Sequence, residues 1–128
     1  MLKRTFLGIG IRDKSVEAVE FYQKAFDAKL VNSVKNDEGG YIHAELDVYG
    51  QIITVGEAWP KDKELITGTI MQYNLHFTRG SENIIRKIYD VLKEDANVHT
   101  PIGECFFSPL MFGLVDRYGV DWCVFCSK

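Results

Sequence analysis

Two groups of residues in this sequence have types and spacings that could do chemistry. The first is His43 and Glu45, two positions apart in the stretch YIHAELDVYG. Side chains of a β-strand alternate between two faces, so this spacing predicts that both point to the same side. A glutamate beside a histidine can orient the ring as a general base, and we predict this pair as the catalytic residues of an enzyme. The same pattern is also typical of solvent-exposed cross-strand partners.

The second group is the pair Cys123 and Cys126, near the end of the chain. A zinc ribbon needs four ligands and a thioredoxin-type motif begins a helix, whereas this pair lies in an apolar run typical of a strand. Residues i and i+3 of a strand point to opposite faces, so these sulfurs are not expected to share a metal or a disulfide. We predict that Cys123 lines a cleft and that Cys126 is a terminal thiol. Cys105 is expected in a loop, without a role.

Composition excludes several function classes. The chain has 128 residues, is 46% hydrophobic and 26% charged, and carries a formal net charge of −3 at pH 7. Acids and bases are interspersed, so no basic stripe predicts binding to nucleic acid. No apolar run approaches the roughly 20 residues that span a bilayer, and no signal peptide is recognisable, so no membrane partner is expected. Three cysteines suit a reducing compartment, and we predict a cytoplasmic protein.

The elements that must position these residues occur twice along the chain. Strands are predicted at 5–12, 29–35, 41–50 and 51–56, and again at 70–78, 97–102, 109–116 and 119–126. Asp13 or Ser15 is the expected N-cap of the first helix, and Gly80-Ser81 begins the second. An offset of 67 positions superposes the two helical stripes, and it also carries Leu7 onto Asn74. The stripes are Ala18, Phe21, Tyr22 and Ala25, and Ile85, Ile88, Tyr89 and Leu92.

The repeat predicts an α+β fold of two βαβββ modules, at about 1–56 and 69–128 with a linker at 57–68, forming curved mixed sheets around a cleft. Each sheet would bury an apolar face, including Ile42, under its helix. The half-polar faces would line the cleft, and they hold these side chains: Tyr41, His43, Glu45, Gln72, Asn74, His76, Asp121, Cys123 and Phe125.

Four motifs in this order resemble a known family. VEFYQKAFDAKL is similar to the first-helix signature of the vicinal oxygen chelate superfamily, which includes glyoxalase I, bleomycin-resistance proteins and extradiol dioxygenases. Within it, IHAELDVYG, ECFFSPLMFG and VDRYGVDW resemble the PhnB-like branch. The resemblance covers nearly the whole chain. It implies paired βαβββ modules, a concave shared cleft and a homodimer.

The resemblance also implies where metal ligands would stand. The superfamily places four in the cleft, and their positions match Leu7, Ile53 or Thr54, Asn74 and Cys123. Leucine has no donor atom, and two remaining ligands do not hold a divalent ion. We therefore predict no metal and no cofactor. A site of another kind, built from His43, Glu45 and His76, stays open.

The predicted function is metal-independent binding of a small, partly apolar organic molecule. Besides the catalytic pair, the ligand-binding residues are expected to be Tyr41, Asn74, His76, Phe107, Cys123 and Phe125. One alternative is a metal-dependent lyase or isomerase of the glyoxalase or dioxygenase type. Another is an antibiotic-sequestering binder of the bleomycin-resistance type, with Glu45, Asp47 and Asp121 facing a cationic ligand. The identity of the ligand, and whether a reaction is catalysed, stay open.

Overall fold

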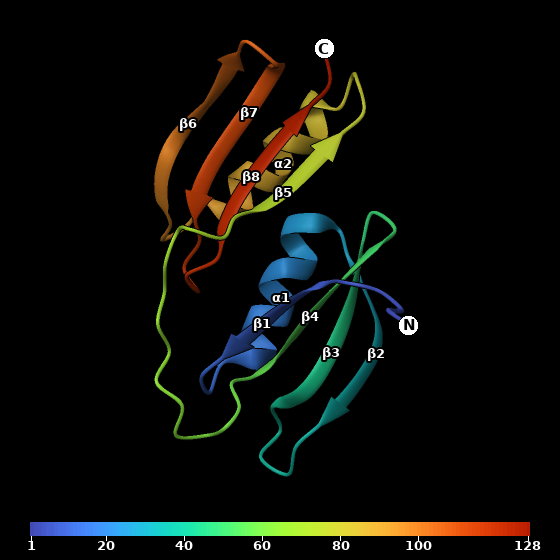
Figure 1. The fold of residues 1–128 in the computed structure, drawn as a ribbon, viewed down its shortest axis with the longest axis vertical. Helices are drawn as coiled ribbons and strands as arrows, with labels where there is room; N and C mark the ends of the chain where they lie inside the picture. The colour runs from blue at the N-terminus through green and yellow to red at the C-terminus, as the bar shows by residue number, and fades with distance from the viewer. The chain divides into compact units, whose positions relative to one another are not determined.

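A computed structural model describes all 128 residues, which divide into two compact units, Met1–Leu65 and Ile66–Lys128 (Figure 1). Each unit runs β-α-β-β-β, so the predicted α+β class is confirmed. The first contains β1 (Leu7–Ile11), α1 (Ser15–Phe26), β2 (Lys29–Lys35), β3 (Tyr41–Val48) and β4 (Gln51–Glu57). The second contains β5 (Tyr73–Phe77), α2 (Glu82–Leu92), β6 (Asn97–Cys105), β7 (Ser108–Val115) and β8 (Asp121–Cys126).

Each unit holds one four-stranded mixed sheet. The strand orders are β1-β4-β3-β2 and β5-β8-β7-β6, with the first pair of each sheet parallel and the other pairs antiparallel. Helix α1 packs on β3, β4 and β1, whereas α2 packs on β7 and β8. One face of each sheet is therefore covered by a helix, and we call the other its open face. Neither helix has the length and apolar character needed to cross a membrane.

The predicted stripes form the cores of both units. In the first, Ala18, Tyr22 and Ala25 of α1 are buried, and they share the covered side with Leu46 and Ile53 of the sheet. The second core contains Ile85, Ile88 and Leu92 of α2 together with three sheet residues, Phe112, Trp122 and Val124. Burying these apolar side chains is the main favourable term in folding, and it fixes which face of each strand remains open.

The start of β3 departs from simple alternation. His43 pairs with Val34 of β2 but Tyr41 pairs with Lys35, so β3 has one extra residue, Ile42, and forms a β-bulge. Because of this extra residue, Tyr41 and Ile42 point to the opposite faces from those that simple alternation would give. Tyr41 is buried and Ile42 is 60% exposed. The predictions that Tyr41 faces the open side and that Ile42 faces the core are therefore wrong.

The start of α1 is held by a distant glutamate. The N-cap position is Lys14, which makes no side-chain capping bond, so neither Asp13 nor Ser15 is the cap. Instead, the backbone N–H groups of Asp13 and Ser15 donate to the carboxylate of Glu57, at 2.8 and 3.1 Å. Glu57 is the last residue of β4, where the sequence suggested the first residue of a linker.

The strands of the two units are not related by the offset that superposes their helices. Leu7 lies on the covered side with Ile9 and Ile11, whereas Asn74 is exposed on the open face. An offset of 67 would place Leu7 and Asn74 on the same face, so this predicted equivalence is wrong. Gly8, which is exposed in β1, is the residue whose face matches that of Asn74.

Candidate functional site on the open sheet faces

The predicted pair His43 and Glu45 lies on the open face of the first sheet. Nε2 of His43 is 3.0 Å from Oε1 of Glu45, and a guanidinium nitrogen of Arg4 lies 3.5 Å from the same oxygen. The hydrogen bond from His43, with help from Arg4, outweighs desolvation and lowers the pKa of the Glu45 carboxyl. The ionised carboxylate can hold the histidine ring in one orientation and leave Nδ1 free, which is the geometry that a general base requires.

The open face of the second sheet has an aromatic end. His76 of β5 stacks on Phe125 of β8, with ring centroids 4.4 Å apart and planes inclined by 21°. Phe107 meets Phe125 edge-on at 5.3 Å. Nε2 of His76 is 2.8 Å from the hydroxyl of Ser127, so this ring is fixed within the aromatic group. The ring of His76 therefore extends the apolar surface of Phe125, and its Nε2 makes a polar contact with Ser127.

The same face has a polar end at the start of β8. The side chain of Asp121 is only 3% exposed, and its Oδ1 lies 2.8 Å from Nε2 of His99 and 3.2 Å from the amide nitrogen of Gln72. Nδ1 of His99 is 2.9 Å from the hydroxyl of Thr100. A Cβ atom on Gly113 would lie 2.5 Å from Cε1 of His99, so the glycine makes room for the ring. We call Asp121, His99 and Gln72 the polar network.

Sequence reasoning missed His99. Its strand was predicted only as far as 102, and the alternation of NVHTPI gives no sign of a partner 22 positions further along the chain. Asp121 was expected only as an acidic wall of the cleft. A search for histidines that could reach an aspartate across an antiparallel sheet would have found the pair, given the pairing of β6, β7 and β8.

Asn74 and Cys123 lie opposite each other between these two ends, because they are paired in the parallel β5–β8 ladder. Burial, followed by the charge of Asp121 and the neighbouring Cys105, raises the pKa of the Cys123 thiol. All three cysteines are free. Cys105 is the last residue of β6 and not part of a loop, and Cys126 is buried with its sulfur 3.8 Å from a carboxylate oxygen of Glu82.

The predicted ligand-binding residues thus fall into three sets. Asn74, His76, Cys123 and Phe125 share the open face of the second sheet, and Phe107 joins them through its contact with Phe125. His43 and Glu45 lie together on the first sheet. Tyr41 stands apart, because the bulge places it on the covered side.

Comparison with known families identifies the fold. The sequence profile of the Glyoxalase/Bleomycin resistance protein/Dioxygenase superfamily matches residues 9–124. The chain belongs to this superfamily. A search of curated proteins found no sequence match to this superfamily chain.

Solved structures support the same assignment for this glyoxalase-superfamily chain. The PhnB protein from Bacillus cereus is 25% identical, with a TM-score of 0.79 over 98% of this chain and 100% of that one. Protein PA1353 from Pseudomonas aeruginosa is 20% identical, with a TM-score of 0.76 over 98% of both chains. The fosfomycin resistance protein FosX from Listeria monocytogenes is 11% identical, with a TM-score of 0.68 over 100% and 95%. The resemblance to the PhnB-like branch is confirmed.

The four positions where this superfamily would place metal ligands do not provide a donor set that fits a divalent ion. Leu7 and Ile53 are paired on the covered side of the first sheet, and neither has a donor atom; of the neighbouring pair Gly8 and Thr54, only Thr54 offers one, a hydroxyl. In the second sheet, Asn74 and Cys123 are paired and offer one hard oxygen donor and one soft sulfur donor. Two such donors do not hold a divalent ion, which takes four or more ligands. Neither unit gathers three His, Cys, Asp or Glu side chains into a metal-binding cluster.

Proposed function

We propose that this chain binds a small organic molecule on the open face of its second sheet, without a metal. The observation that carries the proposal is the pairing of an aromatic end with a polar network on one face. Asp121 and Phe125 are four residues apart on β8, which corresponds to roughly 13 Å along a strand. A molecule with one apolar and one polar end, and about this length, would satisfy both ends at once.

Each side chain has a role in this proposal. Phe107 and Phe125 contact the apolar part of the ligand, and the ring of His76 extends that wall. Asn74 offers its exposed amide to the middle of the molecule, beside the small side chain of Cys123. The polar network receives the polar end. Few polar groups placed around an apolar surface are the usual arrangement of small-molecule sites.

Proton transfer is the second candidate function, and the contact of 3.0 Å between His43 and Glu45 favours it. Glu45 would hold the ring, and His43 would accept a proton from an acidic C–H group of a molecule bound on the open face of the first sheet. The fold alone does not support this step, because one fold hosts many reactions. Deuterium incorporation into a bound ligand in D₂O tests it. We expect incorporation with the natural chain and none with His43→Gln.

Binding is tested by NMR with aromatic acids, amides and alcohols of graded length, in buffer containing EDTA. We expect saturable shifts of the backbone amides of Asn74 and Phe125. Phe125→Ala should weaken binding at least tenfold, whereas Ile70→Ala, which changes a fully exposed apolar side chain outside the face, should not. Unaltered binding by Phe125→Ala would contradict the proposal.

Two further outcomes would replace the proposal by an alternative. Binding that requires stoichiometric Zn²⁺, Ni²⁺, Mn²⁺ or Fe²⁺ would indicate a metal-dependent lyase, isomerase or dioxygenase. Selective, tight binding of a cationic glycopeptide would indicate an antibiotic-sequestering protein.

We also propose a homodimer in the cytoplasm. Exposed apolar side chains, among them Phe106 and Met71, supply surface that a second copy could cover, and three free thiols suit a reducing compartment. Light scattering after size-exclusion chromatography tests the dimer. A molecular mass near 14.6 kDa at all concentrations would contradict it.

A further inference from the structure

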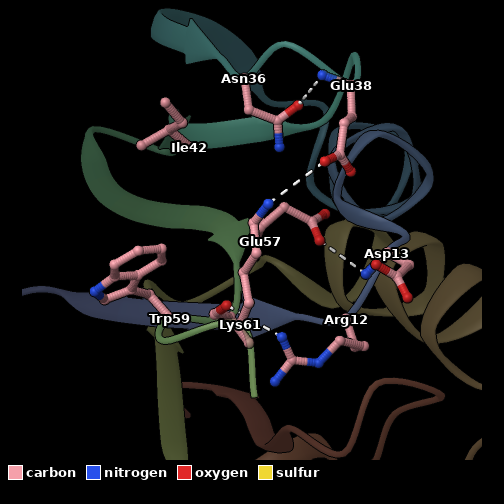
Figure 2. Close-up of a pocket in the computed structure, with 9 residues that line it drawn as sticks. Arg12, Asp13, Asn36, Glu38, Ile42, Glu57, Trp59 and Lys61 are labelled. Carbon is pink, nitrogen blue, oxygen red and sulfur yellow. Dashed lines mark hydrogen bonds and ion pairs between the residues drawn. The ribbon is translucent and has the colours of Figure 1, made fainter. Parts of the chain in front are cut away.

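A pocket of about 450 Å³ lies in the first unit, and its lining residues include neither His43 nor Glu45 nor any residue of the second unit (Figure 2). Its walls come from the end of β1 and the loop after it, the β2–β3 turn with the start of β3, and the end of β4 with the segment that follows. The lining residues used below are Arg12, Asn36, Ile42, Glu57, Trp59 and Lys61. The volume lies within the range of about 300–1,000 Å³ typical of small-molecule sites.

Two apolar side chains face this pocket although the fold does not bury them. Trp59 is 76% exposed, and Ile42 is 60% exposed because the β-bulge at the start of β3 turns it away from the core. An indole and a branched aliphatic chain provide a broad apolar surface that stays in contact with water. A flat apolar molecule between them would remove this surface from water, which is favourable in proportion to the area covered.

Five charged residues line the pocket, and besides Asp13 each has a partner for its side chain. Glu57 accepts the N–H groups at the start of α1, and Lys61 forms an ion pair of 3.4 Å with Glu38. The guanidinium of Arg12 donates to the backbone carbonyl oxygens of Ala58 and Lys63. Charge alone therefore does not select a ligand.

The hydrogen-bond donors of Asn36 and Lys61 do favour one class of ligand. Oδ1 of Asn36 accepts the backbone N–H groups of Glu38 and Gly40, both at 2.9 Å, and this fixes which way the amide points. Its nitrogen, with two N–H donors, is turned away from Glu38 toward the pocket (Figure 2). Lys61 is a second donor, and its exposed ion pair costs little to rearrange. Both groups would bond to an acceptor oxygen.

We propose that this pocket binds a flat, largely apolar organic molecule through a carboxylate or amide oxygen. The apolar body lies between Trp59 and Ile42, and the oxygen accepts hydrogen bonds from Asn36 and Lys61. This inference is independent of the function proposed for the second sheet, because all residues that line the pocket belong to the first unit.

Three probes with the same flat body test the polar end: cinnamate, cinnamamide and cinnamylamine. The readouts are the side-chain N–H signals of Asn36 and of the Trp59 indole in ¹H–¹⁵N spectra. The indole of Trp122 is an internal reference, because it is buried and bonded to Asp116 at 2.8 Å. We expect saturable shifts with cinnamate and cinnamamide, and none with cinnamylamine. A preference for the amine, or no saturation with any probe, would overturn the proposal.

Variants separate the contributions of the walls and the donors. Trp59→Ala should weaken both oxygen-bearing probes at least tenfold, whereas Ile66→Ala, an exposed apolar position outside the pocket, should not. Asn36→Asp keeps the oxygen that the turn needs but removes the donors, so we expect a loss of about tenfold. Lys61→Met should affect cinnamate more than cinnamamide, which distinguishes a charged from a neutral ligand. Unchanged affinity in both Trp59→Ala and Asn36→Asp would refute the site.

Discussion

Replacing Glu57 by glutamine should loosen the start of α1, directly after the loop residue Asp13 that lines the first-unit pocket. The carboxylate accepts the N–H of Asp13 at 2.8 Å through one oxygen and the N–H of Ser15 at 3.1 Å through the other. Glutamine has one acceptor oxygen, and its NH₂ group cannot accept. Glu57→Gln therefore leaves one of these N–H groups without its partner.

The size of the effect follows from these two bonds. An amide N–H that loses its partner costs roughly 1–3 kcal/mol, and the lower part applies here because water reaches this site. Loss of a negative charge at a helix N-terminus adds roughly 0.3–1 kcal/mol. We expect the free energy of opening the start of α1 to fall by about 2 kcal/mol in total. This is equivalent to about 30-fold faster hydrogen exchange at the amides of Asp13 and Ser15. Glu64→Gln, which alters an exposed glutamate in the same unit, should change neither exchange nor the free energy of unfolding.

The pH dependence provides a second check. Burial acts to raise the pKa of the Glu57 carboxyl, but hydrogen bonds from Ser15 and Asp13 and the charge of Arg12 outweigh it, so the pKa is lowered. A group whose pKa is lower in the folded state stabilises that state above its unfolded pKa of about 4.3. The natural chain should therefore be more stable than Glu57→Gln by the full amount at pH 7, and this difference in stability should shrink as the pH falls below about 4. A difference that persists unchanged at pH 3 would refute this reasoning.

Two further predictions concern the second sheet. Gly113→Ala places a Cβ within 2.5 Å of Cε1 of His99, so we expect loss of the His99–Asp121 hydrogen bond, seen in imidazole ¹⁵N spectra, and a destabilisation of about 1–3 kcal/mol. Gly103→Ala, where a Cβ meets no atom within 4 Å, is the matched control, and equal effects of both would contradict the steric argument. Cys123 is buried and the pKa of its thiol is raised, so iodoacetamide should alkylate it more slowly at pH 8.5 in the folded chain than in urea. Mass spectrometry of the digested protein measures both rates, and equal rates would argue against a protected thiol.

Periodicity in the sequence predicts the elements that carry these sites. The strand predicted at 29–35 coincides with β2, and the helical stripe of Ala18, Tyr22 and Ala25 is buried as expected. Such positions are predictable because burying one face of a helix or strand imposes a spacing of 3.6 or 2 residues on the chain itself. Placement of Asn74 and Cys123 on one open face follows from the same alternation.

Other features depend on partners that are distant in sequence. Glu57 precedes a segment rich in charge and turn residues, which indicates a linker, but its role comes from N–H groups 42 and 44 positions away. The bulge at Ile42 is a shift of register between two strands, and no single residue type marks it. His99 gains its role only when β7 places Asp121 within reach. Local spacing contains none of this information.

The two modules share a fold but not the chemistry of their open faces. On the first sheet, β1 presents Gly8 and Gly10 to the open side, so the strand offers backbone where the equivalent strand β5 offers Asn74 and His76. A side chain at Gly8 would come within 3.3 Å of the Thr54 hydroxyl, so this position has little room for a donor. A ligand near β1 would meet peptide groups, whereas a ligand near β5 would meet polar side chains. The shared scaffold therefore does not determine the chemistry of its open faces, which depends on the residues that each strand carries.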